Sequence, residues 1–386
     1  MSDAWELSEE LRTLQDTVRR FMDQEVRPAE DKVEHDSMTL LPEDLARLRG
    51  MTRDMGLWCY QTAEEYGGAG LSLMGQVIMA EETAKCRMGA YNPACGAFGS
   101  NPPNAIFGGT PEQIEKYAMP VIRGEGRAFI ALTEPGGGAD PRRAIATKAV
   151  RKGDKYILNG TKVFITGVGE ATWGLLFART EDDKISCFIV EPDKPGFECT
   201  PIPVIRAYYP YEINLVDYEL PAENLLGAEG EGFTLAQEWL VHGRVPYAAA
   251  CIGIAQESLR LAIEWAGQRE TFGSLLSDKQ AIQWMIADSE IELRAARLLV
   301  YQAAWNGELG KDIKIDASIA KVYATETAGR VVDRCIQIFG GLGVSKEMPL
   351  ERWYREMRIK RIGEGPSEVH RMVLARDLLR DARRKK

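Results

Sequence analysis

The sequence predicts an α+β protein with helices over residues 1–128, a β domain over 129–240 and a helix bundle over 241–386. Three observations predict this order. Apolar residues recur at three- and four-residue spacing at both ends of the chain, and two-residue alternation with β-branched residues takes over in the middle. The last third also holds helical runs long enough to pack as an antiparallel bundle. A chain of 386 residues can hold two or three such domains.

The first segment begins with a capped amphipathic helix. Ser8 precedes two glutamates and provides an N-cap, and Pro28 is expected to close the helix. Apolar residues follow the cap at helical spacing: Leu11, Leu14, Val18 and Phe21. Further helices are expected over 45–55 and 73–85. Another starts at Thr110, a cap followed by a proline in the first turn.

The middle segment reads as strands. Residues 155–158 and 161–165 flank Asn159-Gly160, which is a strong signal for a two-residue hairpin turn. Further strands are expected over 173–178, 185–190 and 212–218. After residue 241 the chain returns to helical spacing, and long helices are expected over 246–266, 279–305 and 315–339.

Composition excludes several classes of function. The net charge of −9, with charges interspersed, disfavours a nucleic-acid ligand. Three histidines and seven scattered cysteines without C-x-x-C spacing give no metal site and indicate reduced thiols. No apolar run is long enough to span a membrane. The acidic N-terminus resembles neither a secretory signal nor a transit peptide, so we expect a cytoplasmic protein.

The common nucleotide motifs are absent, which leaves three unusual candidates. The first is Glu364, a carboxylate on a glycine-flanked turn before a helix start, where it could serve as a general base or simply be solvated. The second is the glycine-rich loop 131–140, which could offer backbone N–H groups to an anion or merely join two domains. The third is a strand carrying Phe164 and Thr166, side chains two apart that could hold a flat heterocycle or form an ordinary strand.

Six motifs together resemble the acyl-CoA dehydrogenase family, from about Leu7 to Leu379. They are L-T-E-P-G-G-G-A-D at 132–140, N-G-T-K-V-F-I-T at 159–166, P-A-E-N-L-L-G at 221–227, R-E-T-F-G-S-L-L at 269–276, Q-I-F-G-G-L-G at 337–343 and G-E-G-P-S-E-V-H at 363–370. The resemblance implies a helical N-terminal domain, a β-barrel or sandwich middle domain and a C-terminal four-helix bundle. It also implies FAD as cofactor, an acyl-CoA as substrate and no metal.

The resemblance assigns roles to individual residues. FAD contacts fall on Leu132, Thr133, Gly138, Ala139, Phe164, Thr166, Arg269, Phe272, Gln280, Gln337, Gly341, Pro366 and Glu368. In the family, those from Arg269 to Gly341 reach the FAD of a neighbouring subunit, so a homo-oligomer, usually a tetramer, is implied. Glu364 would abstract the α proton while flavin N5 takes the β hydride, giving a trans-2-enoyl-CoA. Arg244, Gly363 and Gly365 would bind substrate, and an electron-transferring flavoprotein is the expected acceptor.

The chain also departs from the family pattern. Some branches carry the base beside Arg244, but that position is Gly243 here, which leaves the role to Glu364. Ala139 replaces a serine, Pro366 replaces a threonine, and Gly363 replaces an aromatic residue, which should widen the acyl pocket. Two alternatives stay open. One is an oxidase or a monooxygenase that uses oxygen as acceptor. The retained Glu364 fits an oxidase and disfavours a monooxygenase. The other is a non-catalytic FAD-bound structural or assembly relative.

Overall fold

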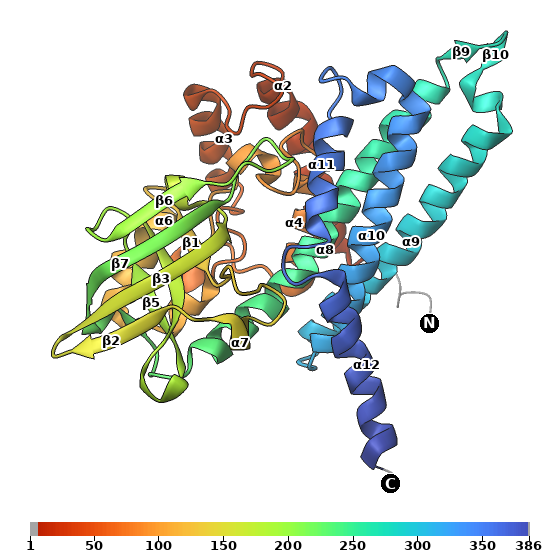
Figure 1. Ribbon diagram of the computed structural model, residues 1–386. Coiled ribbons are helices and arrows are strands. Elements are labelled where there is room, and N and C mark those ends of the chain that lie inside the picture. The colour runs from red at the N-terminus through yellow and green to blue at the C-terminus, as the bar shows by residue number, and fades with distance from the viewer. Residues whose placement is uncertain (1–6, 385–386) are drawn as a thin grey trace. The chain divides into compact units, whose positions relative to one another are not determined.

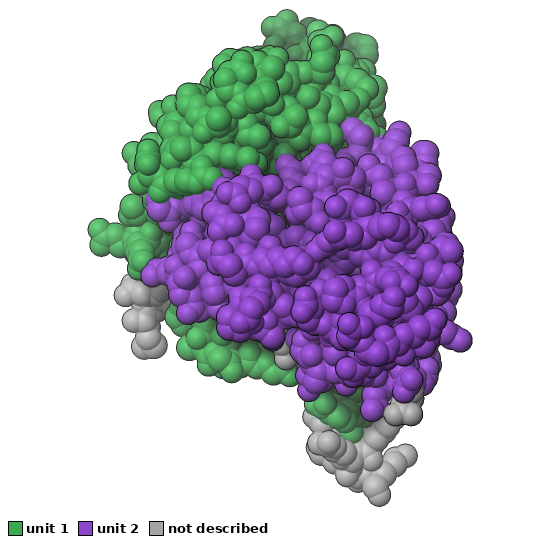
Figure 2. Space-filling model, turned by 90° about the vertical axis from the view of Figure 1, so that its left-hand side faces the viewer, with its two compact units in different colours: residues 1–55, 71–98, 241–386 green, residues 56–70, 99–240 purple. Residues whose placement is uncertain are grey.

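The computed structural model describes residues 7–384, without the side chains of residues 182, 238–240, 242 and 381–384. The chain folds into two compact units, coloured separately in Figure 2. Unit 1 comprises residues 1–55, 71–98 and 241–386, and unit 2 comprises residues 56–70 and 99–240. The predicted order of helices, strands and helices is confirmed (Figure 1).

The N-terminal helices of unit 1 follow the sequence pattern closely. They are α1 (Glu9–Phe21), α2 (Arg27–Glu30), α3 (Pro42–Asp54) and α4 (Leu73–Thr83). The Ser8 hydroxyl caps α1 by accepting from the Leu11 amide at 3.3 Å, as expected. Pro28 does not close the helix. A π-helical turn over Met22–Val26 shifts the register, so that Pro28 stands in the first turn of α2, where its missing N–H costs little.

Long helices make up the rest of unit 1, and the first of them, α8, begins in unit 2 (Figure 1). They are α8 (Gly232–Ala266), α9 (Gln280–Glu308), α10 (Lys314–Phe339), α11 (Leu350–Lys360) and α12 (Ser367–Arg384), with a short hairpin of β9 (Glu270–Thr271) and β10 (Ser274–Leu275) between α8 and α9. Alanines dominate the buried faces of α8, α9 and α10, which lets backbones approach closely. At Gly253 of α8 a Cβ would lie 2.0 Å from the Glu81 backbone oxygen of α4, so only glycine permits this crossing.

Unit 2 is built on one eight-stranded mixed sheet with the order β6-β7-β3-β2-β4-β5-β8, and β1 pairs in parallel with β4. The strands are β1 (Ala128–Ala131), β2 (Lys148–Lys152), β3 (Lys155–Ile165), β4 (Trp173–Arg179), β5 (Ile185–Val190), β6 (Phe197–Pro201), β7 (Tyr211–Pro221) and β8 (Leu225–Leu226). Three short helices complete the unit: α5 (Pro111–Gln113), α6 (Met119–Arg123) and α7 (Pro141–Ala144).

Both faces of the sheet are apolar at its centre. Trp173, Leu175 and Phe177 of β4 enter one buried cluster, and Leu176 and Ala178 enter the other. This alternation is the period of two that a strand imposes on its side chains. A strand buried on both faces explains why the sequence of β4 is a continuous apolar run.

The predicted turn at Asn159-Gly160 is wrong, because both residues lie inside β3, which pairs with β2 and β7. A bulge occupies this point of the β3–β7 ladder, and the Asn159 carboxamide oxygen accepts from the Asp217 amide at 2.8 Å. Gly160 is needed for a close approach, since a Cβ there would lie 2.7 Å from the Thr147 Cα. Asparagine and glycine therefore serve a bulge rather than a turn.

Within residues 7–384, no helix combines the length and the apolarity that crossing a lipid bilayer would require.

Candidate active site

The turn between α11 and α12 presents Glu364. Its φ of +57° lies in the left-handed region, which costs free energy for any residue with a Cβ, and Gly365 follows with φ of +92°. The Ser367 amide donates to the Arg361 oxygen at 3.2 Å and closes the turn as α12 begins. The sequence prediction of a carboxylate just before a helix start is therefore confirmed.

Three side chains from three helices hold the backbone of this turn. Arg244 Nε of α8 donates to the Glu364 carbonyl oxygen at 3.1 Å, and His370 Nε2 of α12 lies 3.1 Å from the same oxygen. Lys321 Nζ of α10 donates to the Gly365 oxygen at 2.7 Å. The strained turn is thus fixed by hydrogen bonds to its backbone, and the carboxyl group of Glu364 takes no part in them.

The Glu364 carboxyl group suits a general base. The residue is half-buried, and its Oε2 is shielded from solvent without a hydrogen-bond partner. Burial raises the pKa of Glu364, and the positive charges of Arg244, Lys360 and Lys321 oppose that rise. A desolvated carboxylate with an unused oxygen is a stronger proton acceptor than a solvated one, and it gains a partner only when a proton donor arrives.

Gly363, the residue before the candidate base, packs against a tyrosine of α8. A Cβ at this position would lie 2.9 Å from the Tyr247 hydroxyl oxygen of α8. That hydroxyl donates to the Lys360 carbonyl at 3.3 Å, and the Lys360 ammonium group stands 4.2 Å from the centre of the Tyr247 ring. A side chain at position 363 would therefore have to move this phenol, and the expected widening of the acyl pocket remains a prediction.

In unit 2 the glycine-rich loop is anchored by a buried ion pair that sequence reasoning missed. Glu134 Oε1 lies 2.7 Å from Lys162 Nζ, and both side chains are fully buried. Glu134 also accepts from the Ala146 and Thr147 amides, and Lys162 donates to the Phe177 oxygen at 2.6 Å. Burial lowers the pKa of Lys162 to about 8, and Glu134 opposes that fall. In the sequence, this ion pair is visible only as one charged residue in each of two motifs, Glu134 in 132–140 and Lys162 in 159–166.

Phe164 and Thr166 do not follow the prediction that they share one face of a regular strand. Phe164 has φ of +58° and is 60% exposed, the register of β3 against β7 shifts between Lys162 and Ile165, and Thr166 follows the end of β3. Simple alternation therefore does not apply to this pair. The Thr166 hydroxyl accepts from Arg206 at 3.3 Å. The backbone of Thr133 is tied to β3, since its oxygen accepts from the Val163 amide at 2.9 Å.

The remaining predicted FAD residues are exposed or half-buried. Leu132, Gly138 and Ala139 belong to the loop after β1, Arg269 and Phe272 flank β9, Gln280 begins α9, Gln337 lies in the last turn of α10, Gly341 follows it, and Pro366 and Glu368 stand at the start of α12. Phe272 is fully exposed with φ of +52° on a hairpin at one end of the long helices (Figure 1). An aromatic side chain held in solvent at a strained position fits a group that a flavin or a second chain would cover.

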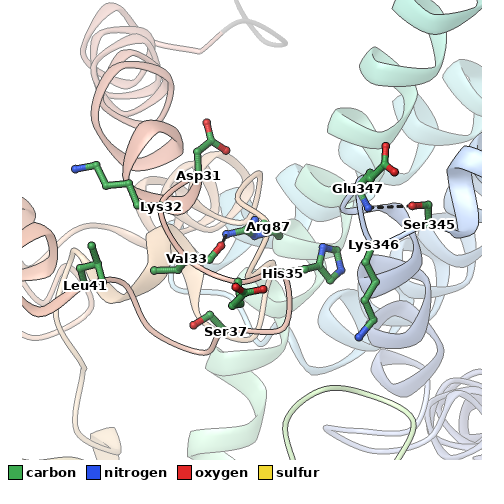
Figure 3. Close-up of a pocket in the computed structure, with 11 residues that line it drawn as sticks. Asp31, Lys32, Val33, His35, Ser37, Leu41, Arg87, Ser345, Lys346 and Glu347 are labelled. Carbon is green, nitrogen blue, oxygen red and sulfur yellow. Dashed lines mark hydrogen bonds between the residues drawn. The ribbon is translucent and has the colours of Figure 1, made fainter.

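A separate cavity of about 760 Å³ lies in unit 1 beside α2, lined by residues of the segment 31–41, by Arg87 and by residues 345–347 (Figure 3). Three of its lining side chains are engaged with other residues. His35 Nε2 lies 2.8 Å from Glu351, Lys32 lies 2.9 Å from Asp44, and Arg87 donates to the Val33 oxygen at 3.0 Å. The predicted catalytic and cofactor residues do not line this cavity, so we do not assign it to the active site.

Comparison with known proteins identifies the family. Three family models match: acyl-CoA dehydrogenase N-terminal domain over residues 8–125, middle domain over 129–208 and C-terminal domain over 230–379. The (R)-benzylsuccinyl-CoA dehydrogenase of Thauera aromatica is 36% identical over 396 aligned positions, covering 98% of this chain and 97% of that protein.

Two solved structures are also similar to this chain over nearly its whole length. Butyryl-CoA dehydrogenase of Megasphaera elsdenii superposes with a TM-score of 0.85 at 33% identity, covering 97% of this chain and 99% of that one. A glutaryl-CoA dehydrogenase of Mycobacterium smegmatis in complex with FADH2 gives a TM-score of 0.85 at 26% identity, covering 96% and 95%. The protein therefore belongs to the acyl-CoA dehydrogenase family of FAD-dependent oxidoreductases.

Proposed function

We propose that Glu364 is the base of an α,β-dehydrogenation that converts an acyl-CoA thioester to a trans-2-enoyl-CoA. The observation that carries this proposal is the Glu364 carboxyl group, whose Oε2 is shielded from solvent and has no hydrogen-bond partner, and whose pKa is raised by burial. Three side chains hold the backbone of the turn that presents it. The Cα–H of a thioester is a weak acid, so the base must be both desolvated and held against it.

The chain's own residues set up the proton transfer. Entry of the acyl group excludes the remaining water from the half-buried carboxylate and raises its basicity further. Gly365 carries no side chain to obstruct the thioester, and the backbone N–H of Glu364 is our candidate donor to the developing enolate oxygen. The guanidinium of Arg244 adds positive charge near the turn without neutralising the base, because its Nε bonds the Glu364 backbone oxygen. Bound FAD would supply the acceptor for the β hydride.

We assign FAD binding to the loop residues Leu132, Thr133, Gly138 and Ala139, to Phe164 and Thr166, to Arg269, Phe272, Gln280, Gln337 and Gly341, and to Pro366 and Glu368. Their exposure supports this assignment, as does the rigid attachment of the loop, whose Glu134 is bound by two amides and a lysine. Arg244, Gly363 and Gly365 are assigned to the substrate.

We further propose an electron-transferring flavoprotein as the electron acceptor. We also propose a cytoplasmic location, because the cysteines are scattered without a disulfide framework.

We also propose a homo-oligomer, a tetramer by family resemblance, supported by one face of α9. Four large apolar side chains on this helix are 52–67% exposed and recur every seven residues: Trp284, Ile291, Leu298 and Trp305. The opposite face of α9, with Leu293 and Val300, is buried in the core of unit 1 beside α10 (Figure 1). A seven-residue repeat is the pattern with which one helix packs along another, so a second copy is the fitting partner.

Leu298→Glu tests the oligomer, because a charge at the centre of the stripe would have to be buried between chains. Light scattering should show a smaller assembly than the parent, and Gln24→Glu, which introduces the same charge at an exposed position of Met22–Val26, away from α9, should leave the mass unchanged. A parent protein that is monomeric while holding one FAD per chain would contradict the proposal.

The activity is tested on purified yellow protein without oxygen. Addition of acyl-CoAs from butyryl-CoA to benzylsuccinyl-CoA should bleach the flavin with at least one of them, and a thermal-shift series over the same compounds ranks the acyl groups. Rapid reoxidation by air alone would favour the oxidase alternative. A flavin that no acyl-CoA bleaches would favour the non-catalytic relative.

A further inference from the structure

Two side chains contact the backbone oxygen of Glu364, the candidate base. Its carbonyl oxygen lies 3.1 Å from both Arg244 Nε and His370 Nε2. Arg244 has a proposed role at the substrate, whereas His370 has none. The imidazole is 2% exposed, and a Cβ at Gly365 would lie 3.1 Å from its Nε2, so the ring packs directly against the turn.

The chemistry of this contact fixes the state of the ring. A carbonyl oxygen can only accept, so His370 Nε2 must carry the proton and donate it. Burial lowers the pKa of His370 to about 4, and the positive charge of Arg244 on α8 and of Lys321 on α10 also disfavours protonation, while the carbonyl groups of Glu364 and Gly365 favour it. The ring is therefore a neutral donor at neutral pH, and it adds no charge that would weaken a nearby base.

We propose that His370 is a positioning residue for the catalytic base. Together with Arg244 it holds the Glu364 carbonyl, and this keeps the backbone of Glu364 in its left-handed conformation. The side-chain direction of an L-residue follows from its backbone angles, so a turn that relaxes to a negative φ would aim the carboxylate elsewhere. The inference rests on the proposed role of Glu364 as base.

The position of His370 along α12 explains how its ring reaches the turn. It lies one turn inside the helix, and its amide donates to the Pro366 oxygen at 3.3 Å. Side chains of a helix lean toward its N-terminus, so the imidazole extends back to the Glu364 carbonyl oxygen. Lys321, which is buried and donates to the Gly365 oxygen, secures the other side of the same turn, and burial lowers its pKa to about 8.

Two variants separate the hydrogen bond from the volume of the ring. His370→Leu keeps bulk but has no donor, and His370→Gln keeps an amide N–H that can reach a carbonyl. In stopped-flow flavin reduction, His370→Leu should lose up to about 10²-fold in the rate at saturating acyl-CoA, the loss that a misplaced catalytic group produces, with little change in substrate affinity. His370→Gln should recover most of that rate.

A second readout does not depend on turnover. Amide hydrogen exchange over residues 361–370, measured without substrate, should accelerate in His370→Leu and stay near the parent in His370→Gln. His35→Gln is the control, because His35 is a partly buried histidine elsewhere in unit 1 whose partner is Glu351 and not the turn. It should leave both exchange at the turn and flavin reduction unchanged.

The outcomes are distinct. Parental reduction rates and parental exchange in His370→Leu would overturn the role of His370 while leaving Glu364 as base. A Glu364→Gln protein that still reduces its flavin at the parent rate would instead overturn the proposed function. If His370→Leu does not fold, His370→Gln decides alone: a rate near the parent supports the inference, and a loss of about 10²-fold contradicts it, since its amide can donate the same bond.

Discussion

Glu364→Gln separates the chemistry of the base from the geometry that holds it. Glutamine keeps the volume of the side chain but cannot accept the proton. Arg244 and His370 bind the backbone oxygen of residue 364 rather than its side chain, so the turn should be unchanged. A positioned base contributes about 10²–10⁴-fold to a rate, and Gly243 stands at the other position where the family carries a base, so the loss should reach the upper end.

The same substitution should make the protein more stable near neutral pH. The raised pKa of Glu364 means that folding favours the protonated, uncharged form, so the free energy of unfolding of the parent falls as pH rises through that pKa. Glutamine is uncharged at every pH and lacks this slope. The variant should therefore be more stable than the parent at neutral pH, and the difference should vanish at low pH, where the carboxyl group of the parent is protonated in both the folded and the unfolded state.

Three measurements together test this reasoning. Stopped-flow anaerobic reduction gives the rate, thermal unfolding between about pH 5 and pH 8 gives the stability, and the visible spectrum gives FAD content. Glu347→Gln, which removes the same charge from an exposed position, should match the parent in all three. The mechanism is wrong if Glu364→Gln reduces its flavin within about tenfold of the parent, far less than a lost base should cost. The burial argument is wrong if the variant is less stable than the parent at neutral pH.

Two further changes probe contacts that only the fold reveals. Gly363→Ala should destabilise the protein by about 1–3 kcal/mol, since its Cβ would press on the Tyr247 hydroxyl, and adding Tyr247→Phe should relieve most of that cost in a double-mutant cycle of thermal unfolding. Additive effects would show that the two side chains do not meet. Lys162→Met should cost about 3–5 kcal/mol in denaturant unfolding and lower FAD content, because it leaves Glu134 charged, buried and without its lysine. Glu134→Gln in the same chain removes the buried charge while its carboxamide oxygen can still accept from the Ala146 and Thr147 amides, so it should restore most of the stability, and a continued loss would contradict the ion-pair account.

The sequence alone determined the features that depend on near neighbours along the chain. Helix spacing, the Ser8 cap and the apolar run of β4 each reflect interactions within a few residues, and the corresponding elements formed where they were expected. The turn that carries Glu364 was predictable for the same reason, since glycines on both sides and a following proline restrict the backbone locally.

Tertiary structure decided the contacts between residues far apart in sequence. Asn159 and Gly160 have the local preferences of a turn, yet pairing of their strand with two others, and the Asp217 amide that Asn159 binds, made them a bulge. Gly363 packs against the Tyr247 hydroxyl although 116 positions separate the two residues, a distance along the chain over which local sequence patterns predict no contact. Local preferences are worth about 1 kcal/mol or less per residue, whereas burial and strand pairing act on many residues together, so packing prevails wherever the two disagree.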